Sequence, residues 1–349
     1  MPIEINRMFK SFGKTEVLRG IDLDIADGEL VALLGPSGSG KTTLLKIIAG
    51  LDWPDSGQLR VGGVDWLALT PQERRIGFVF QNYALFPHMT VRDNIAFGLT
   101  VRPRGERPTT SEITHRANEL LGFLQIEGLG DRYPSQLSGG QRQRVALGRA
   151  MAIEPTVLLL DEPFGALDAA VRRDLRRWLR GVHDATGTTT IFVTHDQEEA
   201  FELADRVVVM NNGVIEQIGD AAAIHDAPAT PFIADFMGAT IQLPATVHDG
   251  LISAAGVDAA NLRAPDTPNG PATLFVRPED AGPYADDAGQ WTVASVATTG
   301  TQLRLVLRDD HGIEIPADLR RRAVDAARLR PGARVSLRPD AASVFAETA

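Results

Sequence analysis

The chain has 349 residues, of which 44% are hydrophobic and 23% charged, and this length and composition favour a globular protein of two domains. The absence of cysteine excludes disulfides, thiolate catalysis and cysteine-ligated zinc or iron–sulfur centres. A net charge of −10 argues against broad nucleic-acid binding, which requires a basic surface. No apolar run approaches the roughly 20 residues of a membrane span, and no signal peptide is evident, so we expect a cytoplasmic protein.

Two N-terminal segments, residues 3–5 and 17–25, alternate apolar and polar residues, and this pattern predicts half-exposed antiparallel strands. Phe12 lies between them in a predicted loop. An aromatic side chain at such a place can stack on a nucleotide base, but an isolated one more often fills a small core. From Phe12 alone, both interpretations stay open.

A short aliphatic run at residues 30–34 predicts a buried parallel strand, and residues 43–49 predict a helix that stops at Gly50. The glycine-rich turn between them lets backbone amides curl around an anion at the positive end of the helix. Lys41 would reach the β- and γ-phosphates of a nucleotide, and the Thr42 hydroxyl would ligate Mg²⁺. The sequence therefore predicts a phosphate-binding P-loop, with Thr43 at the start of the helix as a further nucleotide-binding residue. The P-loop comprises Gly35, Pro36, Ser37, Gly38, Ser39, Gly40, Lys41 and Thr42.

Residues 58–61 and the Gly62-Gly63 pair that follows predict a strand that opens a hairpin. Residues 76–80 predict a further buried strand, which ends at Gln81. This glutamine could ligate a metal or orient water, although a solvated loop glutamine is the simpler interpretation. Residues 82–88 place several apolar groups in a loop, where they suit a docking surface and packing on the chain's own core equally well.

A helical pattern runs from about residue 91 to 130, and a basic, proline-containing stretch at 102–108 predicts a linker between helices. The sequence Leu-Ser-Gly-Gly-Gln at 137–141 then precedes a predicted helix at 142–150. Ser138 is a candidate N-cap, and Gly139 and Gly140 would leave amides exposed at a second positive helix end. Taken alone, this motif is most simply an ordinary capped helix.

The aliphatic strand predicted at 157–160 ends in two carboxylates. Beside a P-loop, Asp161 could hold Mg²⁺ through water, and Glu162 could polarise the water that attacks the γ-phosphate. Adjacent acids at a strand end are frequently just exposed polar residues, but the P-loop upstream favours the functional interpretation. A tight loop at 165–168 enters a helix, with Asp168 as its candidate N-cap.

His195 ends another predicted core strand, at 188–194. A lone histidine there is more often structural than catalytic, but on the P-loop side of the sheet its imidazole would contact the γ-phosphate. A terminal hairpin is predicted over 206–218. From about residue 239, short alternating strands predict a small β-barrel-like domain, for which we favour a structural, dimerising or regulatory role over nucleic-acid binding.

These segments appear in the order and approximate spacing of the ATP-binding cassette (ABC) ATPases, which the chain resembles over residues 1 to about 238. The motif at 137–141, called the signature below, is close to diagnostic between a P-loop and a carboxylate strand. The resemblance implies that Phe12 stacks on adenine and that Gln81 senses Mg²⁺ and the membrane partner. Glu162 would be the catalytic carboxylate and His195 the switch residue. The ATP held by a second subunit would be bound by Ser138, Gly139, Gly140 and Gln141, with Asp168 also in the nucleotide site.

The implied fold is an α/β P-loop NTPase domain with a mixed sheet core, an antiparallel β subdomain and a helical subdomain at about 91–155. The implied division is 1–238 for the ABC ATPase and 239–349 for a small β-barrel-like domain that regulates or dimerises. The resemblance implies an ATP hydrolase that works as a homodimer with ATP and Mg²⁺ on the cytoplasmic face of the membrane. Its partners would be two integral-membrane permease subunits and, indirectly, a solute-binding protein, but not nucleic acid.

Residues 93–108, 131–134 and 175–180 look like the sulfate/thiosulfate import ATP-binding proteins, so sulfate or thiosulfate is the implied cargo. Molybdate, iron(III), polyamine or sugar are alternative cargoes within the same importer class. A soluble ABC-type ATPase acting on DNA or ribosomes is the alternative from another class, but one P-loop, one signature and no sustained heptads argue against it. The missing apolar spans exclude an exporter with fused membrane helices.

Overall fold

The computed structural model describes residues 1–165, 169–321 and 328–347. The chain forms two compact units, Met1–Ala222 and Ala223–Ala349. The division falls within helix α7 (Ala221–Asp226), and the short helix α8 (Pro231–Phe236) belongs to the second unit. The domain boundary expected at residue 238 lies just beyond α8. Neither helix is predicted by the sequence patterns.

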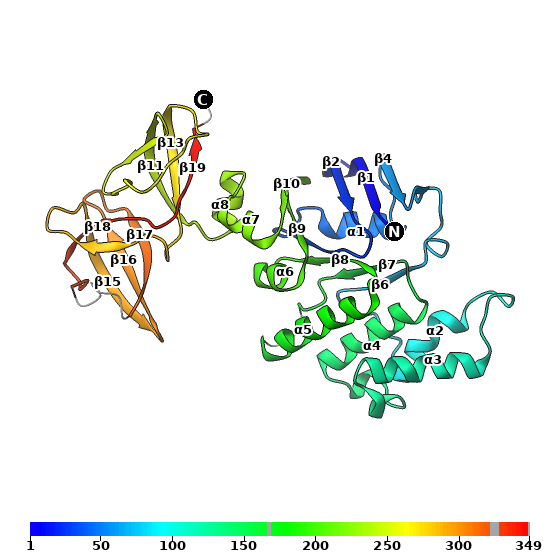
Figure 1. The fold of residues 1–349 in the computed structure, drawn as a ribbon. Coiled ribbons are helices and arrows are strands. Elements are labelled where there is room, and N and C mark those ends of the chain that lie inside the picture. Colours follow the sequence, from blue (N-terminus) through cyan, green and yellow to red (C-terminus); the bar gives the residue numbers. More distant parts are fainter. Residues whose placement is uncertain (166–168, 322–327, 348–349) are drawn as a thin grey trace. The chain divides into compact units, whose positions relative to one another are not determined.

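A six-stranded mixed sheet forms the centre of the first unit, in the order β10-β9-β3-β8-β7-β6 (Figure 1). Neighbouring strands pair in parallel except at one edge, where β10 is antiparallel to β9. The strands predicted from aliphatic runs, β3 and β7, are fully buried, as expected for a parallel sheet covered on both faces. The six strands are β3 (Leu30–Leu34), β6 (Ile76–Val79), β7 (Val157–Asp161), β8 (Thr189–Thr194), β9 (Arg206–Asn211) and β10 (Val214–Gly219).

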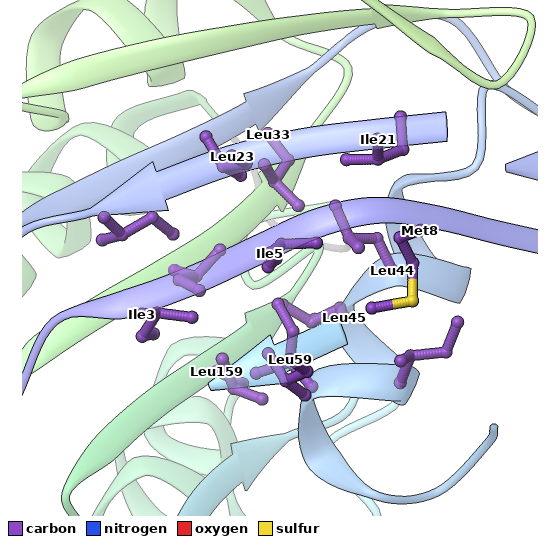
Figure 2. Packing of buried hydrophobic residues seen from close by; sticks show 14 of the residues in the cluster. Ile3, Ile5, Met8, Ile21, Leu23, Leu33, Leu44, Leu45, Leu59 and Leu159 are labelled. Carbon is purple, nitrogen blue, oxygen red and sulfur yellow. The ribbon is translucent and has the colours of Figure 1, made fainter. Parts of the chain in front are cut away.

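A four-stranded antiparallel sheet, in the order β2-β1-β4-β5, packs with helix α1 (Lys41–Ala49) against one face of the mixed sheet. Apolar residues of both sheets and of the helix share one core, among them Ile5, Leu45, Leu59 and Leu159 (Figure 2). This core fixes α1, and with it the start of the P-loop helix, against the parallel strands. The antiparallel pairing predicted for the N-terminal segments is confirmed, in strands β1 (Ile3–Phe12), β2 (Thr15–Ile25), β4 (Ser56–Val61) and β5 (Val64–Asp65).

Helices cover the other face of the mixed sheet and extend into a helical part of the first unit (Figure 1). The side chains of Thr90 and Thr109 cap α2 and α3, and the linker predicted at 102–108 separates these two helices. Together with α4 they enclose an apolar core of their own, which includes Ile95, Leu121 and Val145. No helix in the described part of the chain is long and apolar enough to cross a membrane. The helices are α2 (Val91–Thr100), α3 (Thr110–Phe123), α4 (Gly139–Ala152), α5 (Ala169–Thr186) and α6 (Gln197–Leu203), with 3₁₀ turns at Glu127–Leu129 and Pro134–Gln136.

The second unit contains two antiparallel sheets, in the orders β12-β11-β13-β19 and β14-β18-β15-β16-β17. Along β11 every other residue is buried, and three of them, Ile241, Leu243 and Ala245, join one core that includes Leu274, Trp291 and Leu305. The β-rich fold predicted for the C-terminal part of the chain is confirmed. Its strands are β11 (Ile241–His248), β12 (Leu251–Ala254), β13 (Gly270–Val276), β14 (Pro283–Ala285), β15 (Trp291–Thr299), β16 (Gln302–Arg308), β17 (Glu314–Arg320), β18 (Arg334–Leu337) and β19 (Ser343–Ala346).

Candidate functional site

The parallel register of the mixed sheet gathers the candidate residues at one edge. Leu34, the last residue of β3, lies opposite Thr194, the last residue of β8. Asp161, at the end of β7, lies opposite Val193 of β8. Because the P-loop follows Leu34 and His195 follows Thr194, the P-loop, the two carboxylates and the histidine all leave the sheet at its carboxyl end. This is the edge at which open α/β sheets bind their ligands.

The P-loop depends on its glycines at two positions. Gly35 has φ of 150°, and a Cβ there would overlap the carbonyl oxygen of Met210 on β9. Gly40 has φ of 101°, and a Cβ there would lie 2.7 Å from the carbonyl oxygen of Val17. At Gly38, by contrast, nothing lies within 4 Å of the corresponding point, so this part of the loop is open. The P-loop backbone therefore packs closely against β9 and β2 at Gly35 and Gly40, whereas at Gly38 it leaves room for a ligand.

Lys41 begins α1 and is buried, and the P-loop backbone holds its ammonium group. Its Nζ donates to the carbonyl oxygens of Gly35 and Pro36, both at 2.8 Å, and to Ser39 Oγ at 3.2 Å. Burial lowers the pKa of Lys41, and the nearby carboxylates oppose that shift. A buried cation held only by neutral oxygens interacts more strongly with an anion such as a phosphate when one is present.

Thr42 and Asp161 meet across the gap between α1 and β7. Thr42 Oγ1 donates to Asp161 Oδ1 at 2.8 Å, and the side chain of Asp161 is buried. Burial raises the pKa of Asp161, and the charge of Glu162 raises it further, while the bond from Thr42 acts in the opposite direction. Hydroxyl and carboxylate oxygens are the ligands that Mg²⁺ prefers. Among the described residues, no group of three or more acidic, histidine or cysteine side chains could hold a metal ion.

Glu162 is the point where three strand ends converge. Gln81, just beyond β6, donates from Nε2 to Glu162 Oε2 at 2.8 Å. His195 Nδ1 lies 3.6 Å from Glu162 Oε1. Glu162 itself has a left-handed backbone, with φ of 45°, which is costly for a residue other than glycine and is typical of functional sites. The structure thus brings the three predicted catalytic residues into contact through one carboxylate.

The signature residues form the start of α4. The Ser138 side chain accepts a hydrogen bond from the Gln141 amide, and Gln141 Oε1 accepts one from the Ser138 amide at 3.0 Å. Gly140 is closely packed, since a Cβ there would lie 3.0 Å from Val171 Cγ1 on α5. Helix α4 lies on the opposite face of the mixed sheet from α1 (Figure 1). The signature of this chain is therefore separated by the sheet from the core that holds its own P-loop helix.

The remaining predicted site residues are Phe12, Thr43 and Asp168. Phe12 lies exposed at the end of β1, and Lys10 Nζ is 4.8 Å from the centroid of its ring. The hairpin that follows it brings Val17 against Gly40 of the P-loop. Thr43 is half-buried in the first turn of α1. Asp168 lies outside the described residues.

Three further charged residues, of which Glu199 and Arg74 are buried, are not predicted by the sequence patterns. Glu199 accepts a hydrogen bond from the hydroxyl of Thr194, next to His195, and burial raises the pKa of Glu199. Arg74 is buried and Arg149 is half-buried, and each donates to backbone carbonyls of another segment. A single polar residue in a helix or loop carries no local pattern that separates burial from solvation, so no sequence signal marks these three.

Comparison with known proteins extends these observations. A family model described as ABC transporter matches residues 18–165, and one described as TOBE domain matches residues 274–346. The sulfate/thiosulfate import ATP-binding protein of Methylococcus capsulatus is 51% identical over 348 residues, which cover 99% of each chain. That of Caulobacter vibrioides is 55% identical over 322 residues, covering 91% of this chain and 93% of the relative. That of Mesorhizobium japonicum is 59% identical over 280 residues, covering 80% and 81%.

Solved structures share the fold of the first unit. The dimeric structure of the ABC transporter cassette MJ0796 matches with a TM-score of 0.57 and 34% identity, covering 63% of this chain and 98% of that one. A dimeric post-hydrolysis state of the same cassette, bound to ADP and Pi, matches with a TM-score of 0.56 and 33% identity over the same shares. The full-length similarity to the import proteins covers both units. The chain therefore belongs to the family of sulfate/thiosulfate import ATP-binding proteins, within the ABC transporter ATPases.

Proposed function

We propose that this chain hydrolyses ATP as the cytoplasmic subunit of an importer of sulfate and thiosulfate. The observation that carries the proposal is the Glu162 carboxylate, held between Gln81 and His195 beside Lys41 and Asp161. A carboxylate in this position can polarise a water molecule, and a cation and a hydroxyl–carboxylate pair lie where a triphosphate would be bound. The similarity to sulfate/thiosulfate import ATP-binding proteins supports the cargo.

The P-loop would bind ATP through its backbone amides, from Gly35 to Thr43, with Phe12 against the adenine. On ATP binding, Lys41 would exchange its carbonyl partners for phosphate oxygens. Thr42, Gln81 and, through water, Asp161 would hold Mg²⁺, which neutralises charge on the β- and γ-phosphates. Glu162 would then accept a proton from the attacking water, while His195 contacts the γ-phosphate.

The reaction would need two copies of the chain. In each copy the signature lies across the sheet from the P-loop helix, so the amides at the start of α4 are left for the γ-phosphate of a partner's ATP. Ser138, Gly139, Gly140 and Gln141 would bind it, with Asp168 also contributing to the nucleotide site. The dimers described for the MJ0796 cassette support this arrangement. ATP would stabilise the dimer, and hydrolysis would weaken it.

Opening and closing of the dimer would drive two integral-membrane permease subunits, which in turn receive the anion from a solute-binding protein. The chain would attach peripherally to the permeases on the cytoplasmic face of the membrane. Residues 1–238 would act as the ATPase and residues 239–349 as a regulatory or dimerising domain, with no part binding nucleic acid. The match of residues 274–346 to the TOBE domain supports a separate role for the second part.

Uptake of labelled sulfate and thiosulfate tests the proposal, in cells that lack this gene and receive either the wild-type chain or Lys41→Ala. Rescue by the wild type and not by Lys41→Ala is expected. If uptake never depends on the gene, the cargo assignment is wrong, and the same cells are then tested with molybdate, iron(III), polyamines and sugars. Co-purification of the chain with ribosomes or DNA in place of permeases would overturn the importer class itself.

A further inference from the structure

The loop that follows Gln81 has a strained backbone. Tyr83 and Ala84 both have left-handed conformations, with φ of 62° and 44°, although neither is glycine. Such residues persist only where the surrounding structure holds them in place. Tyr83 is buried, and its hydroxyl has no hydrogen-bond partner within the described ranges. Two successive strained residues require contacts from outside the loop to hold their backbone in place.

Arg149, in the last turn of α4, supplies this anchor. Its Nη1 donates to the carbonyl oxygen of Ala84 at 2.6 Å, and its Nη2 donates to that of Tyr83 at 3.0 Å. Its guanidinium group also lies 5.4 Å from the centroid of the Phe86 ring. Burial lowers the pKa of Arg149, but an arginine stays charged at neutral pH. Both bonds are therefore charge-assisted, and the bond to Tyr83 is also partly shielded from water, which strengthens it.

The anchored residues adjoin Gln81 directly. The amide of Tyr83 donates to the carbonyl oxygen of Phe80 at 2.8 Å, which closes a turn around Gln81. Gln81 in turn donates to Glu162. A continuous path of hydrogen bonds and short backbone steps therefore joins Arg149 to the Glu162 carboxylate. At its other end, the helix that carries Arg149 begins at the capped Ser138.

We propose that Arg149 is a positioning residue that holds Gln81 against Glu162 and ties the position of α4 to that contact. The inference rests on the ATPase function proposed above. Because α4 is one unbroken helix, a displacement of its signature end carries Arg149 with it and moves the two carbonyls that Arg149 holds. Without the guanidinium, both carbonyls lose their donors, and the strained turn relaxes away from the geometry that points Gln81 at Glu162.

Arg144 provides a matched control on the same helix. Its Nη1 donates to the carbonyl oxygen of Leu124 at 3.0 Å, and its guanidinium lies 5.0 Å from the centroid of the Trp178 ring. It therefore combines a backbone bond and an aromatic contact, as Arg149 does, but anchors a segment remote from Gln81. Any general loss of packing on α4 should affect Arg149→Met and Arg144→Met alike.

Hydrogen–deuterium exchange of the full-length chain tests the anchor without reference to ATP. In Arg149→Met, amides in residues 80–87 should exchange on the order of tenfold faster, because two charge-assisted bonds are lost. Arg144→Met should leave these amides unchanged, and Arg149→Lys, which keeps the charge but cannot span both carbonyls as a fork, should give an intermediate rate. Wild-type protection of residues 80–87 in Arg149→Met would overturn the inference.

A double-mutant cycle then tests whether Arg149 acts through Gln81. ATP turnover in Arg149→Met should fall about tenfold, as a displaced catalytic group predicts, with the KM for ATP nearly unchanged. In the Gln81→Ala background the same substitution should cause no further loss. Equal losses in both backgrounds would make Arg149 merely structural. If the wild type itself does not hydrolyse ATP, the proposed function fails, while the exchange experiment still decides the role of Arg149.

Discussion

Thr42 Oγ1 and Asp161 Oδ1 are joined by a hydrogen bond of 2.8 Å, although the two residues lie 119 positions apart in the sequence. The bond connects the first turn of the P-loop helix to the end of β7. Asp161 is buried beside a second carboxylate, Glu162, so the ionised form of Asp161 is unfavourable in the free chain. A divalent cation would relieve this repulsion, and the site is therefore less stable when it is empty than when an ion is bound.

Asp161→Asn should make the free chain more stable at neutral pH while it abolishes Mg²⁺-dependent turnover. The folded-state pKa of Asp161 is raised above its ordinary value, so its contribution to stability is fully present below that ordinary value. The contribution is lost as the pH rises through the raised pKa. Asparagine carries no charge and still accepts the hydrogen bond from Thr42. The thermal unfolding midpoint of the variant should therefore exceed that of the wild type at pH 7, and the two midpoints should agree in acid.

Scanning calorimetry from pH 4 to pH 8 measures this difference between Asp161→Asn and the wild type. Addition of MgCl₂ with ATP should raise the midpoint of the wild type but not that of the variant. A variant that is less stable than the wild type at pH 7 would show that the Asp161 carboxylate supports the fold, contrary to the argument from burial.

Lys41→Ala should weaken ATP binding by about 10- to 100-fold, the range for losing hydrogen bonds to a charged group. The ammonium group of Lys41 is buried and held only by neutral oxygens, so it is free to bind phosphate strongly. Alanine removes this group and with it the whole interaction. Titration with a fluorescent ATP analogue measures the change. Lys46→Ala on the same helix removes an exposed charge and serves as the control. Equal losses in both variants would mean that only the net charge of α1 matters.

Glu162→Gln should lower ATP turnover by at least about a hundredfold, the lower end of the range for a general base. Gln81 and His195 converge on this carboxylate, and an amide in its place cannot accept a proton from water. ATP binding should stay intact, and a dimer should accumulate in the presence of ATP. Phosphate release and size-exclusion chromatography measure the two effects. Near-normal turnover would falsify the assignment of Glu162.

The sequence predicted the parts of the site that depend on local chemistry. Continuous aliphatic residues predict the buried strands β3 and β7, and the glycines between β3 and α1 predict the P-loop. Ser138, as a candidate N-cap, predicts the start of α4. The common edge of P-loop, carboxylates and histidine also follows, because parallel strands all end on the same side. The roles proposed for Gln81 and Phe12 come from the resemblance to a known family, because their own surroundings in the sequence left those roles open.

The anchors of the site could not be predicted because their partners are distant in the sequence. Arg149 binds the carbonyls of Tyr83 and Ala84, 66 and 65 positions away, and backbone carbonyls leave no mark in a sequence. The left-handed backbone of Glu162 could not be predicted either, because only glycine or asparagine at that position would have indicated it. The contacts of Arg149 and Glu162 depend on how the whole unit packs, which no short stretch of the sequence determines.

Arg74→Met should destabilise the first unit by about 3 kcal/mol, because hydrogen bonds to a buried charged group contribute about 1.5–3 kcal/mol and their loss leaves carbonyls unpaired. Arg74 is buried and donates from Nη1 to the carbonyl oxygens of Ile47 and Ile48, at 2.7 and 2.8 Å. It thus places a cation at the C-terminal end of α1, where the helix dipole favours one. A third bond, from Nε to the carbonyl oxygen of Leu69 at 3.3 Å, orients the guanidinium group.

The neighbouring residue separates this contact from a general effect of charge. Arg75 is exposed, so Arg75→Met should change the free energy of unfolding by less than about 0.5 kcal/mol. Urea unfolding followed by circular dichroism measures both variants. If the two lose stability equally, the carbonyls of α1 do not depend on Arg74. If Arg74→Met alone is destabilised, α1 is held at both ends, by the P-loop before it and by the Arg74 guanidinium after it, and its C-terminal anchor becomes a second determinant of where Lys41 and Thr42 meet the phosphates.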